Sequence, residues 1–396
     1  MAQRVMAICL ALASTGLLAA QGSRVDAAWD LLAKGQRAQA IAILREAIKA
    51  EPRNGDARLL LGSMLMEERQ ATESIEELNE AVRLKPDSSE AHNALGEAYN
   101  TFGYLKAARP EFEKAVKIDP RFAQARVNLA AVMLQDEEAA AAAEHLNRAI
   151  SLIGKTADAA YPLYLRGKIQ LEAREPAKAV PDLEQAVKLR PDFAEAWSDL
   201  GEARRNLLDD SGALEAFQRA VELSPEDSVA QTRCGSKLLE MGKANDAVPH
   251  LQAAVRLDPR NQSALNSLQT ALRKDGQTAQ ADAVRRQLAE VIRERDNNDQ
   301  NVMKAMEAND RGTALDRGGD VRGAIEKYRA ALALQPEHAG IRANLAVVLL
   351  KDGQWDEGLS QLREALKRDP HNPDFQRALE QALDQAKAHG IPAAKP

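Results

Sequence analysis

One stretch of 34 residues decides the fold: residues 89–122 read SEAHNALGEAYNTFGYLKAARPEFEKAVKIDPRF. The proline near its end recurs along the chain in steps of 34 residues. It falls in three groups: Pro52, Pro86 and Pro120; Pro191, Pro225 and Pro259; Pro336 and Pro370. This period indicates an array of small helical units, because one helical hairpin cannot bury its apolar face until a neighbour covers it. The sequence therefore predicts an all-α solenoid.

Small residues mark three further positions when each unit is numbered so that its proline is position 32. In the quoted unit, positions 8, 20 and 27 are Gly96, Ala108 and Ala115, and Gly103 near position 15 ends a first helix. We expect helix A at about positions 2–14 and helix B at about positions 18–31, with the small residues letting the two axes approach. The proline excludes helical geometry at the residue before it and so ends helix B.

This pattern resembles the tetratricopeptide repeat, which has small residues at positions 8, 20 and 27 and proline at position 32. About ten such units in near register cover nearly the whole chain. The resemblance implies a right-handed solenoid of helix-turn-helix repeats. Two units depart from the pattern, since Gly154 and Arg293 stand where the proline is expected.

The breaks in register define the expected domains. We expect an array of about eight repeats over residues 21–295, with an irregular turn near 153–159 where the proline spacing is three residues too long. A nine-residue excess then indicates a polar joint at 296–304, where Asp296 to Asp299 end an overlong helix B. Two further repeats at 305–370, a capping helix at 371–390 and a tail at 391–396 complete the chain.

Residues 1–20 have the features of a secretory signal peptide. Arg4 precedes an apolar run, and Ala19 and Ala20 offer small residues for cleavage. The run of about 14 residues is short for a membrane span, which needs roughly 17 to 25. We expect a periplasmic or extracellular protein; the alternative is an uncleaved signal that anchors the chain in the inner membrane. Cleavage would leave Cys234 as the single cysteine, so we expect no intrachain disulfide.

The charge pattern and the motifs of the chain favour a protein without catalytic activity. The net charge is −6 and both signs are interspersed, so there is no basic stripe for nucleic acid. The six histidines show no metal-binding spacing, and no phosphate-binding loop is present. We therefore expect no enzyme, no metal and no cofactor. His92 at position 4 and His250 at position 23 are expected to be partly exposed helix residues.

The resemblance implies that positions 2, 5, 9 and 12 of helix A line a peptide groove. The candidate groove residues at these positions are Asn93, Glu97, Asn100, Val127, Tyr164, Lys168, Ser198 and Glu202. Asparagine can hold a backbone amide with two hydrogen bonds, and tyrosine or valine can hold side chains. The alternative is that they are ordinary surface residues. Asn128 and Asn344 are similar to isolated rungs of the asparagine ladder of glycosyltransferase-linked repeats.

Two functional classes are compatible with the sequence. The first is a non-enzymatic protein–protein interaction scaffold of the bacterial cell envelope, which binds extended peptide segments of its partners in its concave groove. The second is an accessory or targeting subunit of an envelope enzyme, such as a glycosyltransferase, a peptidase or a polysaccharide synthesis and export complex. The residues outside the repeats are too few for a catalytic domain, which favours the scaffold. The sequence specifies neither the partner nor the oligomeric state.

Overall fold

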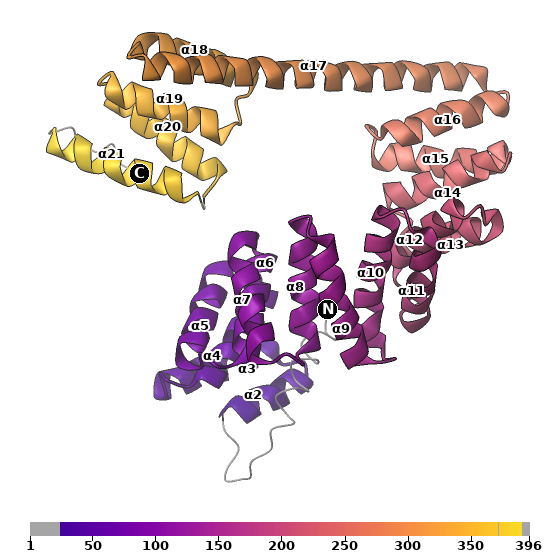
Figure 1. Cartoon of the computed structure of the whole chain (residues 1–396), viewed down its shortest axis with the longest axis horizontal. Coiled ribbons are helices and arrows are strands. Elements are labelled where there is room, and N and C mark those ends of the chain that lie inside the picture. The colour runs from indigo at the N-terminus through magenta and orange to yellow at the C-terminus, as the bar shows by residue number, and fades with distance from the viewer. Residues whose placement is uncertain (1–23, 371, 390–396) are drawn as a thin grey trace. The chain divides into compact units, whose positions relative to one another are not determined.

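The computed structural model describes residues 24–370 and 372–389. Twenty α-helices and one 3-10 turn make up this described part, which contains no strand, and the predicted all-α solenoid is confirmed (Figure 1). The chain divides into two compact units, residues 1–257 and residues 258–396. The expected signal peptide at 1–20 and the tail at 391–396 lie outside the described residues.

Seven helical hairpins follow one another in the described part of the first unit (Figure 1). Their first helices, A, are α2 (Arg24–Ala33), α4 (Gly55–Glu67), α6 (Ser89–Thr101), α8 (Ala123–Gln135), α10 (Ala160–Glu172), α12 (Ala194–Asn206) and α14 (Ser228–Glu240). Their second helices, B, are α3 (Arg37–Ala50), α5 (Ala71–Leu84), α7 (Leu105–Ile118), α9 (Ala139–Ile153), α11 (Pro176–Leu189), α13 (Asp210–Leu223) and α15 (Ala244–Leu257). The 3-10 turn η1 (Ala157–Ala159) precedes α10.

The helix ends follow the expected turn chemistry. Gly103 has a φ of 85°, which ends α6 in the left-handed conformation that glycine adopts without steric cost. Leu208 takes the same conformation, with a φ of 63°, between α12 and α13. At the other end of the hairpin, Asp119 is extended, with φ −120° and ψ 97°, because Pro120 follows it.

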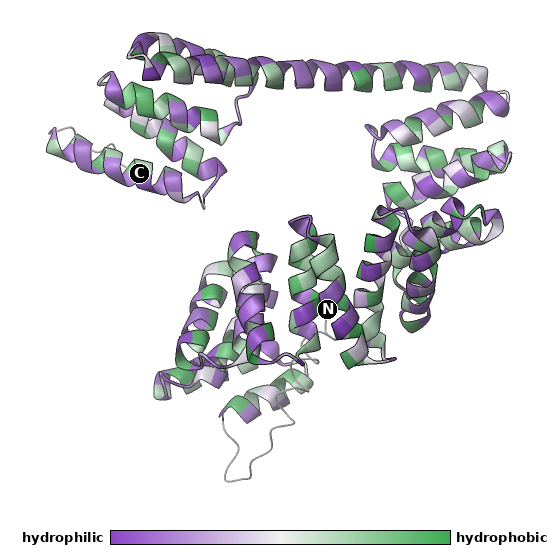
Figure 2. Cartoon of the chain, viewed as in Figure 1, coloured by the Kyte–Doolittle hydropathy of each residue, from purple (hydrophilic) through white to green (hydrophobic). Residues whose placement is uncertain are grey.

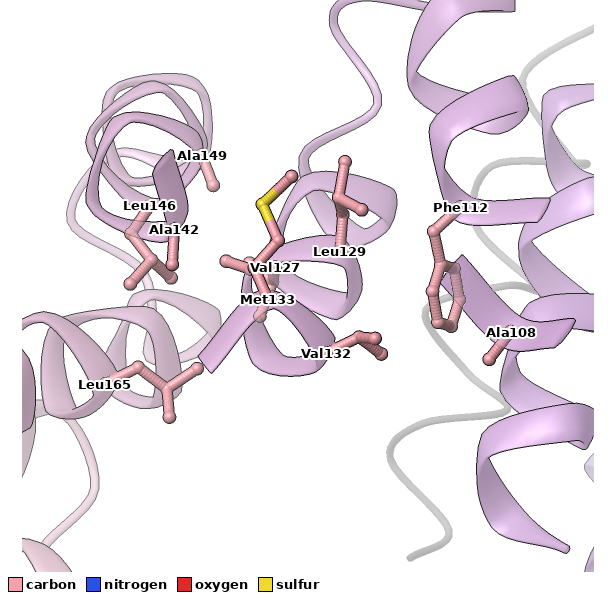
Figure 3. Packing of buried hydrophobic residues seen from close by; sticks show 11 residues of the cluster. Ala108, Phe112, Val127, Leu129, Val132, Met133, Ala142, Leu146, Ala149 and Leu165 are labelled. Carbon is pink, nitrogen blue, oxygen red and sulfur yellow. The ribbon is translucent and has the colours of Figure 1, made fainter. Parts of the chain in front are cut away.

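Small residues bring helices A and B of each hairpin together. A Cβ atom added at Gly201 would lie 2.6 Å from the ring of Phe217 on the facing helix, so the aromatic side chain fills the space that glycine leaves. Between neighbouring hairpins the core is continuous. Figure 3 shows Phe112 of α7, Val127 of α8 and Leu165 of α10 around one such cluster. This shared core explains why a single hairpin does not suffice.

The side chain at position 4 joins consecutive repeats by a contact that was not predicted. His92 lies with Nε2 3.0 Å from the carbonyl oxygen of Pro86 and Nδ1 2.6 Å from Oε2 of Glu111. His92 is therefore buried, and its expected partial exposure is wrong. The same hydrogen bond to the carbonyl of the proline six residues earlier is donated by Arg58, Arg126, Trp197, Gln231, Arg342 and Gln376. Where position 4 carries such a donor, it ties the start of its helix to the turn before it.

The second unit is built around one long helix. Its helices are α16 (Gln262–Lys274), α17 (Thr278–Arg317), α18 (Val321–Leu334), α19 (Ala339–Lys351), α20 (Trp355–Arg368) and α21 (Pro373–Ala388). α17 is at once helix B of the eighth repeat and helix A of the ninth, and its middle is strongly hydrophilic (Figure 2). The expected end of this helix at Asp296 to Asp299 is wrong, because the helix continues through all four residues. α21 follows the last hairpin and packs on it through Phe375, Leu379 and Leu383.

Candidate functional site

Helices A form the inner side of each stack. Helices A of neighbouring repeats contact one another, as α4 contacts α6 and α10 contacts α12. Among the described helices, no two neighbouring helices B contact each other as closely, so each stack curves with helices A inside. We call the side chains at positions 2, 5, 6, 9 and 12 of helices A the inner face. A partner segment that lies along the curve would meet these side chains first.

Three candidate groove residues are packing residues in this structure. Asn93 is 1% exposed, Val127 2% and Ser198 6%, so their expected exposure on the groove is corrected. All three occupy position 5, which faces the neighbouring helix A instead of solvent. Val127 lies within the core cluster beside Met133 (Figure 3). These three side chains can therefore set the spacing of the inner face but cannot bind a partner directly.

Lateral hydrogen bonds connect position 6 of one helix A to position 5 of the preceding one. Asn128 Nδ2 donates to Asn93 Oδ1 at 2.9 Å and to Glu97 Oε1 at 2.7 Å. Asn344 Nδ2 donates to Asn309 Oδ1 at 3.0 Å in the second unit. Both asparagines that are similar to ladder rungs thus make contacts between repeats. This pairing was not predicted, although its spacing of 35 residues could have revealed it in the sequence.

The remaining candidates are accessible to different degrees. Asn100 on α6 and Lys168 on α10 are exposed, whereas Glu97, Tyr164 and Glu202 are half-buried. Glu202 is already paired, since Arg205 Nη2 lies 2.6 Å from its carboxylate. The structure therefore spreads the accessible candidates over three helices A instead of gathering them in one enclosed pocket. Their contact with a partner stays a prediction.

An aromatic cluster lies beside these residues and was only partly anticipated. The ring centroids of Tyr161 and Tyr164 are 6.3 Å apart, and Phe193, just before α12, lies 4.8 Å from Tyr164. The guanidinium carbon of Arg190 lies 3.8 Å from the centroid of the Phe193 ring, a cation–π contact. Burial raises the pKa of the Tyr164 phenol well above its usual range, and the negative charge of Asp199 adds to this. The cluster thus combines aromatic faces with nearby carboxylates.

Metal binding, thiol chemistry and membrane insertion each need particular residues. Among residues 24–370 and 372–389, His, Cys, Asp and Glu side chains do not gather in threes that could hold a metal ion. Cys234 is fully buried in α14, and burial raises the pKa of its thiol to about 11. Within the same described ranges, no helix combines the length and apolarity needed to cross a bilayer.

The inner face of the second unit has a different character. Met306 of α17 and Val347 of α19 are large apolar side chains that are 43% and 40% exposed. Lys351 Nζ pairs with Asp316 at 2.7 Å. This face adds exposed apolar side chains to amide and carboxylate groups such as Asn344 and Asp310.

Comparison with known proteins agrees with the repeat pattern. The tetratricopeptide repeat model matches residues 25–89, 65–120 and 164–228, and a second tetratricopeptide repeat model matches residues 317–387. The BBSome complex member bbs-4 of Caenorhabditis elegans is 38% identical over 61 residues, 15% of this chain. The chain spans only 13% of the length of that protein, so this likeness concerns the repeat alone.

Solved structures show the same fold. The pilF protein of Pseudomonas aeruginosa superposes with a TM-score of 0.50 at 18% identity, over 55% of this chain and 98% of that one. YrrB, described as a tetratricopeptide repeat protein with an unusual peptide-binding site, gives 0.41 at 20% identity, over 48% of this chain and 96% of that one. Such identities show a shared fold and nothing more. With its matched repeats and stacked hairpins, the chain belongs to the tetratricopeptide repeat family and is built as a scaffold for protein–protein interaction.

Proposed function

We propose that the chain is a non-enzymatic scaffold of the bacterial cell envelope, which holds an extended segment of a partner protein against the inner face of its first unit. One observation supports this most directly: Asn100 and Lys168 project from helices A as exposed side chains, and the Lys168 ammonium makes no ion pair with any described residue. An amide can hold a peptide backbone with two hydrogen bonds, and an ammonium can pair with a carboxylate. Neither residue is needed for the core of its hairpin.

Photo-crosslinking in the expressing cell tests the groove directly. A photoreactive amino acid placed at position 100 or 168 should form crosslinks to one partner segment. The matched control places it at Gln39 of α3 or Lys117 of α7, which are exposed on helices B and carry the same amide and ammonium groups. Crosslinks from both control positions, without crosslinks from 100 and 168, would show that the outer helices bind the partner.

The proposed location rests on the composition of residues 1–20. If the signal is cleaved, the protein recovered from the periplasm or medium should begin near residue 21, as measured by intact mass. A full-length chain in the inner-membrane fraction would support the anchored alternative instead. Recovery of one crosslinked enzyme in fixed ratio would identify the chain as an accessory subunit, while the groove remained its binding surface.

A further inference from the structure

The inner face of residues 89–240 carries more negative than positive charge. Its carboxylates are Glu90, Glu97, Glu195, Asp199 and Glu202, and its cations are Lys168, Arg205 and Arg233. Two of the cations are already used, because Arg205 pairs with Glu202 at 2.6 Å and Arg233 with Asp199 at 2.9 Å. Glu195 is exposed and makes no ion pair with any described residue. A segment bound along this face therefore meets excess negative charge.

Glu195 and Tyr161 hold the same repeat position on this face. Both residues occupy position 2, Tyr161 on α10 and Glu195 on the neighbouring α12, and these two helices are in contact. The lateral hydrogen bond from Arg233 to Ser198 shows that adjacent helices A run in register, position 6 against position 5. Positions 5 and 6 of neighbouring helices A thus come within hydrogen-bonding distance. The negative charge of Glu195 also helps, after burial and Asp199, to raise the pKa of Tyr164, whose ring centroid is 6.3 Å from that of Tyr161. This edge of the inner face therefore carries a phenol ring and a free carboxylate on neighbouring helices.

The same cluster already holds one cation of the chain itself. The guanidinium of Arg190 stacks on Phe193 at 3.8 Å, and the rings of Tyr161 and Phe193 are 6.4 Å apart. Tyr161 is half-buried, so part of its ring remains accessible. An aromatic face with a carboxylate next to it attracts a cation by two interactions: with the quadrupole of the ring and with the opposite charge of the carboxylate.

The geometry points to a binding site for a basic side chain, arginine before lysine, that the partner segment places between the Tyr161 ring and the Glu195 carboxylate. This inference rests on the proposed function, because it names the chemistry of the segment that the inner face holds. Arginine is favoured because its planar guanidinium can stack on the phenol and pair with the carboxylate at the same time. Lysine offers a point charge without the flat face.

Lys168 restricts which side chains the same segment can carry nearby. It lies seven residues after Tyr161 on α10, roughly 10 Å along the helix axis. Its exposed ammonium repels a second cation at that distance and attracts a carboxylate. An extended segment covers about 10 Å with three residues. The preferred partner therefore carries a basic residue with a neutral or acidic residue about three positions away.

Peptide binding to the full chain tests the site. The probes are fluorescein-labelled dodecapeptides of Gly and Ser that carry two arginines, two glutamines or two glutamates five residues apart, titrated by fluorescence anisotropy at low salt. We expect the arginine peptide to bind at least about tenfold more tightly than the glutamate peptide. Glu195→Gln should weaken the arginine peptide about three- to tenfold, and Tyr161→Leu should weaken it to a similar extent.

A matched variant separates this site from general attraction to an acidic protein. Glu215→Gln removes one exposed carboxylate from α13 of the same repeat and should change affinity less than about twofold. Glu195 is exposed, so Glu195→Gln keeps the fold even if Tyr161→Leu disturbs packing. Equal affinity for the arginine and glutamate peptides, or a Glu195→Gln variant that binds as the wild type does, overturns the basic site. Failure of the proposed function would give a different result. In that case the double variant Gln39→Ala with Lys117→Ala would lose peptide binding, whereas variants on the inner face would keep it.

Discussion

At two junctions between repeats another residue stands in place of the closing proline, and the two helices behave in opposite ways there. One follows α9, where Gly154 stands at position 32, and the other lies within α17, where Arg293 stands at position 32. Both junctions lengthen the chain between repeats. The first ends its helix and packs the next repeat at once, whereas the second extends its helix into a largely exposed stretch.

At the first junction, Gly154 ends α9 with a φ of 75° and a ψ of −145°, a conformation that is closed to residues with a Cβ. The extra residues form a short loop and the turn η1, whose last residue Ala159 is fully buried, as is Ala160 after it. The repeats on either side share a core across the loop, since Ile153 packs on both neighbouring clusters. A stop signal therefore preserves the stack.

At the second junction, no residue stops the helix. Arg293, Glu294 and Arg295 favour helix. Just before the exposed stretch, Arg260 pairs with Glu294 at 3.0 Å and so holds this part of α17 in place. Beyond that contact, residues 296–304 are exposed apart from the half-buried Asn301, and Met303 is 72% exposed. Packed turns at both ends provide the nucleus, so propagation through this poor helix sequence costs little.

Position 32 thus decides whether the next repeat can dock. A proline or a glycine there forces a turn that returns the chain to the stack, whereas a helix-forming residue separates the repeats by the length of the added helix.

The strongest change should come from a proline in the exposed stretch of α17. Asn298→Pro removes one helical hydrogen bond and clashes with the preceding turn, which costs about 3 kcal/mol or more in a helix interior. Because residues 296–304 are exposed apart from the half-buried Asn301, the loss should fall mainly on that stretch. Hydrogen exchange of peptides covering 293–304 should show the loss of protection, with protection elsewhere unchanged.

A matched proline tests the other junction. Ala157 is the first residue of η1 and follows Thr156, which is extended with φ −100° and ψ 167°. Both conditions suit proline, so Ala157→Pro should change the free energy of unfolding by less than about 1 kcal/mol. Equal losses from the two prolines would mean that the junctions do not differ in helical character.

At the stop signal itself, the expected effect lies between those of Asn298→Pro and Ala157→Pro. Gly154→Ala forces a Cβ into a conformation that only glycine adopts freely and should cost about 1 to 3 kcal/mol, measured by urea unfolding. Arg293→Gly at the same repeat position should cost about 1 kcal/mol of helix propensity, confined to α17 in hydrogen exchange. If Gly154→Ala is neutral, the glycine does not decide where α9 ends.

Most of the fold followed from the sequence because each repeat carries its own local signals. Glycine or another left-handed residue ends helix A, proline ends helix B, and small residues at positions 8 and 20 admit the large side chain at position 24, as Gly201 admits Phe217. These signals act within a few residues of the helix ends that they set. They do not depend on how the repeats stack.

The predictions that were wrong concern features that depend on contacts between repeats. Asn93 and Ser198 looked like free polar groups, but the rotation of each helix A against its neighbour turns position 5 inward, and this rotation is a property of the stack. The continuity of α17 failed for a related reason. Asn297 and Asn298 are weak helix formers, and only the packed turns on both sides keep them helical.

The weakest change should be a response to pH that separates the two junctions. His145 lies in α9, which ends at Gly154, whereas α17 contains no histidine. Burial and then the charge of Arg126 lower the pKa of His145 below its usual 6.5. The unfolded chain therefore takes up a proton near pH 6.5 that the folded chain resists, so stability is present above that pH and is lost as the pH falls below it.

Between pH 7.5 and 5.5, the melting temperature of the wild type should fall more than that of His145→Gln, in which this group no longer titrates. Carboxylates titrate below this window and do not mask the difference. Identical pH dependence of the two proteins would show that His145 is free to protonate in the folded stack and that its position beside Arg126 does not affect stability.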